Sequence, residues 1–145
     1  MIKKMLVISD AEWEVMRVLW AHNSMTSRKI INTLLDILDW KEGTIKSLLN
    51  RLVTKKAIKV DRTQSPFRYS PNITQKEANQ YRIDHVMNSI CNTHYSDIIE
   101  YLIRSYPLSY SDYEQLKTLI STQQVNAPKY IPCQCLKGQC DCHFN

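Results

Sequence analysis

Four cysteines near the C-terminus are the side chains of this sequence best suited to chemistry. They form two C-x-C pairs separated by four residues: Cys133, Cys135, Cys140 and Cys142. Thiolates are soft ligands, and four that converge suit Zn(II), Cu(I) or an iron–sulfur cluster. Gly138 lies between the pairs and allows the tight reversal that brings them together. The pattern predicts a metal site, with a disulfide or redox pair as the alternative.

The other candidates for chemistry are weaker. Cys91 is distant in sequence from the other cysteines and falls on an apolar helical stripe, which favours a buried small side chain. His143 adjoins the tail and is an auxiliary candidate ligand. We find no glycine-rich phosphate loop, HExxH or G-x-S-x-G motif, so no motif supports an enzyme.

Size and composition favour a small, mainly α protein. The chain has 145 residues, 43% of them hydrophobic, with only two glycines and five prolines. This composition supports a packed core and disfavours a turn-rich all-β fold. Apolar runs are too short for a membrane span or a signal peptide. We therefore expect a cytoplasmic protein with no membrane partner, in which clustered cysteines bind metal more often than they form disulfides.

Positive charge is concentrated in one segment. Residues 41–68 carry eight Lys or Arg and only two Asp or Glu, whereas the whole chain has a formal net charge of +5. A local basic block on an otherwise balanced chain favours a polyanionic partner, most simply nucleic acid. A solvated basic surface is the alternative that charge alone leaves open.

A winged helix-turn-helix is expected in residues 1–72. Apolar residues recur at helical spacing over about 10–22, from about residue 26, and around 45–53, where the opposite face is polar and basic. Two segments, 58–60 and 67–69, then alternate as strands do and flank a polar loop. In this arrangement the third helix enters the major groove and the hairpin loop touches the DNA backbone.

Residues 73–125 are expected to form three amphipathic helices, over about 74–94, 97–106 and 111–122. Such short helices cannot bury much core alone. A homodimer would cover their apolar stripes and place two recognition helices one DNA turn apart. Packing of these helices on the winged domain is the alternative. Residues 126–145 are predicted to be a linker and a metal-binding tail.

Three segments resemble the penicillinase-repressor family of winged-helix proteins. They are Ile8–Met16, the segment from Asp39 to Leu52 with its Trp40, and Phe67–Pro71, and the likeness covers about residues 5–120. The cysteine tail is absent from the β-lactam-responsive members of the family. It is similar to the tail of the copper-responsive members, so the resemblance spans nearly the whole chain.

The resemblance implies a repressor of copper-export genes that binds an inverted-repeat operator in double-stranded DNA as a homodimer. It implies that Zn(II) supports the DNA-bound form and that Cu(I), delivered by a copper chaperone, replaces zinc and releases the repressor.

The resemblance also implies where this chain touches DNA. The DNA-facing positions of the family motif fall on the third helix, at Thr44, Lys46, Ser47 and Arg51, with Lys41 nearby. Arg62 and Arg68 are the expected DNA contacts of the hairpin, which touches the backbone in a winged helix. Gly43 stands where relatives carry alanine or lysine, so no side-chain contact is expected there.

Two alternatives stay open at this point. The first is a repressor of the same family whose tail holds a structural zinc and which responds to another inducer. The second is a Cu(I) buffer or chaperone, which would need the tail but not the basic third helix.

Overall fold

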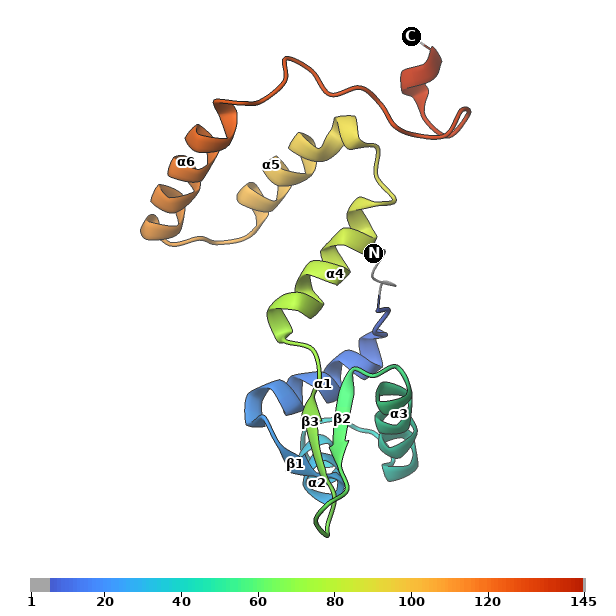
Figure 1. The fold of residues 1–145 in the computed structure, drawn as a ribbon. Coiled ribbons are helices and arrows are strands. Elements are labelled where there is room, and N and C mark those ends of the chain that lie inside the picture. The colour runs from blue at the N-terminus through green and yellow to red at the C-terminus, as the bar shows by residue number, and fades with distance from the viewer. Residues whose placement is uncertain (1–5, 145) are drawn as a thin grey trace. The chain divides into compact units, whose positions relative to one another are not determined.

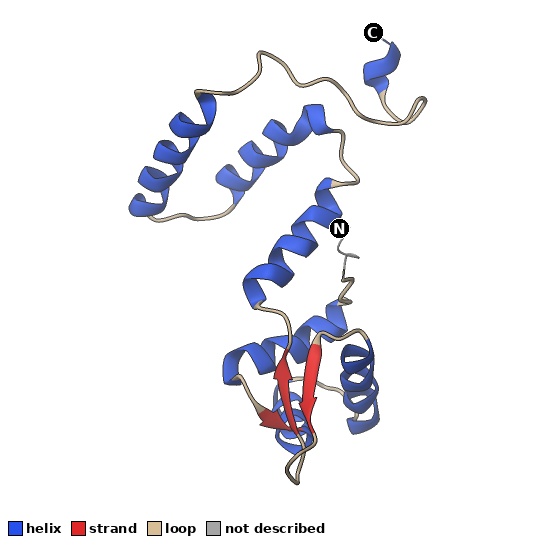
Figure 2. Ribbon diagram, viewed as in Figure 1, coloured by secondary structure: helices blue, strands red, loops and turns tan. Residues whose placement is uncertain are grey.

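Most of the chain is helical, and the strands are confined to one small sheet (Figures 1 and 2). The computed structural model describes residues 6–144. Internal contacts divide the chain between Asp84 and His85 into an N-terminal unit and a C-terminal unit. Among the described residues, we find no helix with the length and apolarity that crossing a bilayer requires.

The N-terminal unit is a winged helix-turn-helix, which confirms the predicted fold. Its helices and strands follow in the order α1 (Asp10–His22), β1 (Met25–Thr26), α2 (Ser27–Ile37), α3 (Glu42–Thr54), β2 (Ile58–Asp61) and β3 (Arg68–Pro71). The antiparallel sheet has the order β1-β3-β2. The strand β1, which the sequence pattern did not predict, pairs Met25 with Tyr69 and Thr26 with Arg68.

Local side-chain chemistry sets where the first helices begin and end. The Ser9 hydroxyl accepts from the Glu12 backbone N–H at 3.2 Å, and the Thr26 hydroxyl accepts from the Lys29 N–H at 3.3 Å. Both contacts satisfy donors that a helix start leaves open. After α1, Asn23 takes a left-handed backbone conformation with φ of 63°, which asparagine tolerates better than most residues.

The core of this unit lies where the three helices meet the sheet. Its largest fully buried side chains are Met16, Leu19, Met25, Ile30, Ile31, Leu34, Ile45, Leu52 and Val15. At its edge the rings of Trp13 and Trp20 pack edge to face with centroids 5.1 Å apart. The Trp20 indole N–H donates to the Ile73 carbonyl at 2.9 Å. This packing positions α3 with its apolar stripe inward and its polar face free.

Helix α4 (Gln75–Met87) begins within the N-terminal unit. Its Ala78 is buried, and the guanidinium of Arg82 lies 4.5 Å from the Trp13 ring centroid and forms an ion pair with Asp10. These contacts explain why the N-terminal unit continues to Asp84, past the boundary expected at residue 72. The helix also ends at Met87, whereas the sequence pattern predicted it to reach about residue 94.

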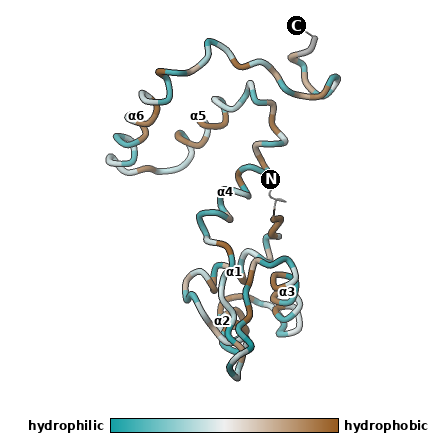
Figure 3. Tube along the Cα trace, in the orientation of Figure 1, coloured by the Kyte–Doolittle hydropathy of each residue, from teal (hydrophilic) through white to brown (hydrophobic). Residues whose placement is uncertain are grey.

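The C-terminal unit contains η1 (Asn92–His94), α5 (Tyr95–Ser105), α6 (Tyr110–Gln124) and η2 (Asp141–Phe144). A capping box starts α6, since Ser109 and Asp112 each accept a hydrogen bond from the other's backbone N–H, at 3.1 and 2.9 Å. Both helices α5 and α6 leave apolar side chains exposed to solvent within this unit. Figure 3 colours the apolar residues of the two helices brown. Leu102 is 47% exposed and Ile120 is 57% exposed.

Candidate metal centre and nucleic-acid interface

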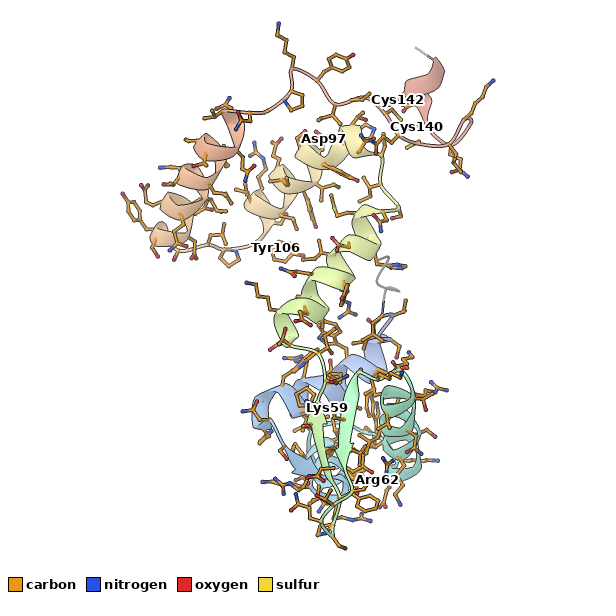
Figure 4. All side chains as sticks on the ribbon, viewed as in Figure 1. Lys59, Arg62, Asp97, Tyr106, Cys140 and Cys142 are labelled. Atoms are coloured by element: carbon orange, nitrogen blue, oxygen red, sulfur yellow. The ribbon has the colours of Figure 1, made fainter. Side chains whose placement is uncertain are left out.

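Four cysteine sulfurs converge in the C-terminal unit. The group consists of Cys91, Cys133, Cys140 and Cys142, whose sulfurs all lie within 4.8 Å of one another. The Cys91 and Cys133 sulfurs are 3.6 Å apart. Figure 4 shows Cys140 and Cys142 beside the start of α5. The structure thus brings together three of the four predicted ligands and adds Cys91.

The prediction that Cys91 is a buried apolar side chain is wrong. Because α4 ends at Met87, Cys91 falls in the turn before η1, where it is half-buried and faces other thiols. The missed signal is the polar sequence that follows it, Asn92-Thr93, since asparagine and threonine side chains compete with helical hydrogen bonds. That signal predicts a helix end but not a metal site.

The two residues after Cys91 hold the tail against this turn. The Asn92 side-chain amide donates to the Pro132 carbonyl at 2.7 Å, and its oxygen accepts from the Gln134 N–H at 3.0 Å. The two contacts lie on either side of Cys133 along the chain. The Thr93 hydroxyl lies 3.0 Å from the Cys91 sulfur and is in contact with a second sulfur of the group at 3.6 Å.

The Thr93 contacts change the acidity of Cys91. Hydrogen bonds from the Thr93 hydroxyl and backbone N–H lower the pKa of Cys91 to about 6. The pKa of Cys133 moves the other way, to about 11: the Cys135 N–H favours its thiolate, but burial and the neighbouring thiols outweigh that contact. A thiolate in the group therefore disfavours ionisation of the neighbouring thiols, and a bound cation would offset the repulsion between thiolates.

The donor set fits a soft, tetrahedral ion. Zn–S bonds of about 2.3 Å in a tetrahedron place sulfurs about 3.8 Å apart. The separation of 3.6 Å between Cys91 and Cys133, and the 4.8 Å limit for the whole group, are close to this spacing. All four donors are thiols, which favours zinc or Cu(I) over magnesium or calcium.

Of the other two predicted candidates, only Cys135 has a described side chain. Cys135 is outside the four, although its thiol contacts Cys91 and its pKa is raised, chiefly by that contact. Its backbone N–H donates to the Cys133 sulfur at 3.4 Å. The side chain of His143 lies outside the described part of the structure, so its predicted role as an auxiliary ligand stays a prediction.

A polar, exposed face of α3 carries most of the predicted DNA contacts. Thr44, Lys46, Ser47 and Arg51 are all exposed on this helix, and Lys41 is exposed at its N-cap. The opposite side of α3 buries Ile45, Leu48, Leu49 and Leu52 in the core. Helical spacing therefore gathers the predicted contacts on one surface, and their contact with DNA stays a prediction.

The wing, which consists of β2, β3 and the loop between them, carries the other two predicted contacts. Their environments differ. Arg62 is exposed in the loop between β2 and β3, with its guanidinium 5.7 Å from the Phe67 ring centroid (Figure 4). Arg68 is half-buried in β3 and donates to the Ser24 hydroxyl at 3.2 Å and to the Ser24 carbonyl at 3.0 Å. Arg62 is therefore placed at the wing loop, whereas Arg68 holds the turn before β1.

One carboxylate sits among the basic side chains of α3. Glu42 is 3.1 Å from Arg28 and 2.8 Å from Lys46. Hydrogen bonds from Arg28, and then from Lys46, lower the pKa of Glu42 to about 2. Within residues 6–144, Lys41 and Arg51 form no ion pair, so these two cations remain available to a polyanion.

The chain is similar to known proteins over most of its length. The family described as "Penicillinase repressor" matches residues 8–122. An uncharacterised 16.5 kDa protein of Latilactobacillus sakei, encoded in the ptsI 3′ region, is 33% identical over 135 residues, which are 93% of this chain and 92% of that protein. The penicillinase repressor of Bacillus licheniformis is 29% identical over 119 residues, 82% of this chain and 93% of that repressor.

The chain is also similar to solved structures. The solution structure of the DNA-binding domain of the repressor BlaI is 38% identical and covers 52% of this chain and 93% of that domain, with a TM-score of 0.47. The family match is the decisive comparison, because it extends from residue 8 to residue 122 of a 145-residue chain. This chain belongs to the penicillinase-repressor family.

Proposed function

We propose that this protein is a copper-responsive transcriptional repressor. It binds an inverted-repeat operator as a zinc-loaded homodimer and leaves the DNA when the cysteines exchange zinc for Cu(I), which raises expression of copper-export genes. A copper chaperone is the proposed donor of Cu(I). The observation that carries this proposal is the convergence of cysteine sulfurs in the C-terminal unit of a winged-helix protein.

The DNA-binding part is supported by the winged-helix unit and its charge. Residues 41–68 hold the basic block, and the exposed face of α3 presents short hydroxyls next to cations. Hydroxyls and guanidinium groups suit phosphates and base edges in the major groove. The family is described as a repressor family, and the Bacillus licheniformis relative is named a penicillinase repressor.

The proposed dimer is supported by the exposed apolar side chains of α5 and α6. Leu102, Leu119 and Ile120 are 47%, 52% and 57% exposed, which is costly for side chains of this size. A second copy would cover them and would supply the second recognition helix that an inverted repeat requires.

Exchange between zinc and Cu(I) has a physical basis in ligand number. One zinc ion is satisfied by four thiolates, whereas Cu(I) accepts fewer thiolates per ion, so the same cysteines arrange differently around the two metals. Zinc supplies a closed tetrahedral centre when bound. The protein contributes the thiolates and the Asn92 contacts that hold the tail in place. If the two arrangements differ in operator affinity, metal and DNA binding are coupled.

The test uses the full-length protein and a duplex from its own operon promoter, located by footprinting. Operator affinity is measured by fluorescence anisotropy with zinc-loaded protein and then during anaerobic Cu(I) titration. We expect tight binding with zinc and release by Cu(I). The double variant Cys133→Ser, Cys135→Ser should show no change in operator affinity when Cu(I) is added.

The alternatives give different results in the same assay. Binding that survives Cu(I) would indicate a structural zinc tail and another inducer. Failure to bind any duplex, together with strong Cu(I) binding, would indicate a copper buffer.

A further inference from the structure

From this geometry we infer that Cys91 is a zinc ligand, completing a four-thiolate site with Cys133, Cys140 and Cys142. The inference rests on the metal-binding part of the proposed function. It changes the nature of the site, because three ligands come from the tail and the fourth comes from the turn before α5. Metal binding then links the tail to the turn before α5, whereas a site built from tail cysteines alone would make no such link.

The sulfur positions support this assignment over the C-x-C-x4-C-x-C set. The sulfurs of Cys91, Cys133, Cys140 and Cys142 all lie within 4.8 Å of one another, and Cys135 is outside that group. The sulfurs of Cys91 and the tail cysteine Cys133 are 3.6 Å apart. A ligand pair 42 positions apart in sequence is therefore as close as a tetrahedral thiolate site requires.

Asn92 gives independent support, because its contacts involve no sulfur. Its amide donates to the Pro132 carbonyl at 2.7 Å and accepts from the Gln134 N–H at 3.0 Å, which fixes the backbone on both sides of Cys133. A single side chain thus sets the position of a tail cysteine relative to its neighbour Cys91. Outer contacts of this kind orient metal ligands in many sites.

Thr93 and Cys135 complete the surroundings of the four thiolates. The Thr93 hydroxyl lies 3.0 Å from the Cys91 sulfur and 3.6 Å from the Cys142 sulfur. The Cys135 N–H donates to the Cys133 sulfur at 3.4 Å, so this residue supports the site through its backbone. Its thiol remains as a fifth sulfur beyond those that one tetrahedral ion needs.

This arrangement gives metal binding a route to the proposed dimer segment. Cys91 immediately precedes η1, and η1 leads without a break into α5. A ligand at this position restrains the start of α5, whose exposed apolar residues are the proposed dimer surface. A change in how Cys91 is bound therefore acts on the dimer segment directly along the chain.

The test compares two single variants of the full-length protein, Cys91→Ser and Cys135→Ser, with the wild type. Co(II) serves as the spectroscopic probe, because its thiolate charge-transfer absorption follows the number of bound thiolates. We expect Cys91→Ser to lose about a quarter of that absorption, one thiolate of four. Its zinc affinity should fall more than about 100-fold, since even outer contacts of a site are worth 10- to 100-fold. Cys135→Ser should keep both properties.

A second measurement needs no variant and so does not depend on folding of Cys91→Ser. Zinc-saturated wild-type protein is alkylated, and the modified cysteines are located by mass spectrometry. We expect Cys135 to be modified and Cys91 to be protected, with protection lost when zinc is chelated. Protected Cys135 with modified Cys91 would overturn the inference and leave the tail-only metal site intact. Wild-type protein that binds neither Co(II) nor zinc would refute the metal-binding part of the proposed function as well.

Discussion

The carboxylate of Glu12 accepts two hydrogen bonds from the Lys55 ammonium, at 2.9 and 2.7 Å, and so joins α1 to the end of α3. The Glu12 side chain is 3% exposed, and Lys55 also donates to the Val7 carbonyl at 2.9 Å. Lys55 is one of the eight basic residues of the segment 41–68. The contact shows that this lysine supports the fold, whereas Arg51, one turn earlier on α3, forms no ion pair within the described residues.

Loss of this ion pair should destabilise the N-terminal unit. Lys55→Met leaves the Glu12 carboxylate buried without its cation, so we expect the free energy of unfolding to fall by about 1–3 kcal/mol. The loss stays within this range because Lys55 itself is partly exposed. Urea unfolding followed by circular dichroism measures the change. The exposed Lys59 on β2 provides the control, since Lys59→Met removes a charge without a buried partner. Equal stability of the two variants would show that the pair contributes nothing.

Gly43→Ala should stabilise the protein. Gly43 lies in the first turn of α3, and a Cβ added there meets no atom within 4 Å. Alanine is favoured over glycine in helices by about 0.5–1 kcal/mol. Gly138 is the matched contrast, because its φ of +87° disfavours any Cβ. We expect urea unfolding to show a gain for Gly43→Ala, and zinc titration to show weaker binding for Gly138→Ala. No gain from Gly43→Ala would point to strain at the start of α3.

Arg51→Ala should weaken operator binding and make it less sensitive to salt. Arg51 is exposed on α3 and unpaired within the described residues, so it is free to meet a phosphate. Loss of one phosphate contact lowers the slope of log K against log salt by about 1. Anisotropy titrations at several salt concentrations give this slope. Arg17→Ala is the control, because Arg17 lies on α1 and pairs with Glu14. An unchanged slope for Arg51→Ala would place the DNA-binding face elsewhere.

Leu102→Asp should disrupt the proposed dimer while leaving zinc binding intact. The side chain is 47% exposed on α5, and a buried aspartate in an apolar interface is costly. Analytical ultracentrifugation should show a monomer, whereas Ser96→Asp, at an exposed polar position of the same helix, should remain dimeric. A dimer in both variants would place the interface away from this part of α5.

Periodicity predicted the winged helix well, because its elements depend on local patterns. Apolar residues such as Ile45, Leu49 and Leu52 repeat at helical spacing and are buried as that spacing requires. The strand β1 is different, since two residues carry no periodic signal. Met25–Thr26 becomes a strand only by pairing with β3, more than forty residues later in the chain.

The cysteine cluster was predicted only in part, for the same physical reason. Spacing within the tail identified Cys133, Cys140 and Cys142, which lie close together in sequence. Cys91 joins them through a fold-back held by Asn92 contacts 40 and 42 residues away. The pattern also extended α4 past its end at Met87, which placed Cys91 on an apolar stripe instead of in a turn.

The edge-to-face pair of Trp13 and Trp20 gives this protein a built-in optical label. All three tryptophans precede residue 85, while six of the eight tyrosines follow it. Indole emission therefore reports the N-terminal unit alone, and tyrosine absorbance reports mainly the C-terminal one. The Arg82 guanidinium lies against the Trp13 ring, so detachment of α4 from Trp13 would shift the wavelength of the tryptophan emission maximum. The unmodified chain can thus show, in two separate optical signals, which unit responds first when metal or DNA is added.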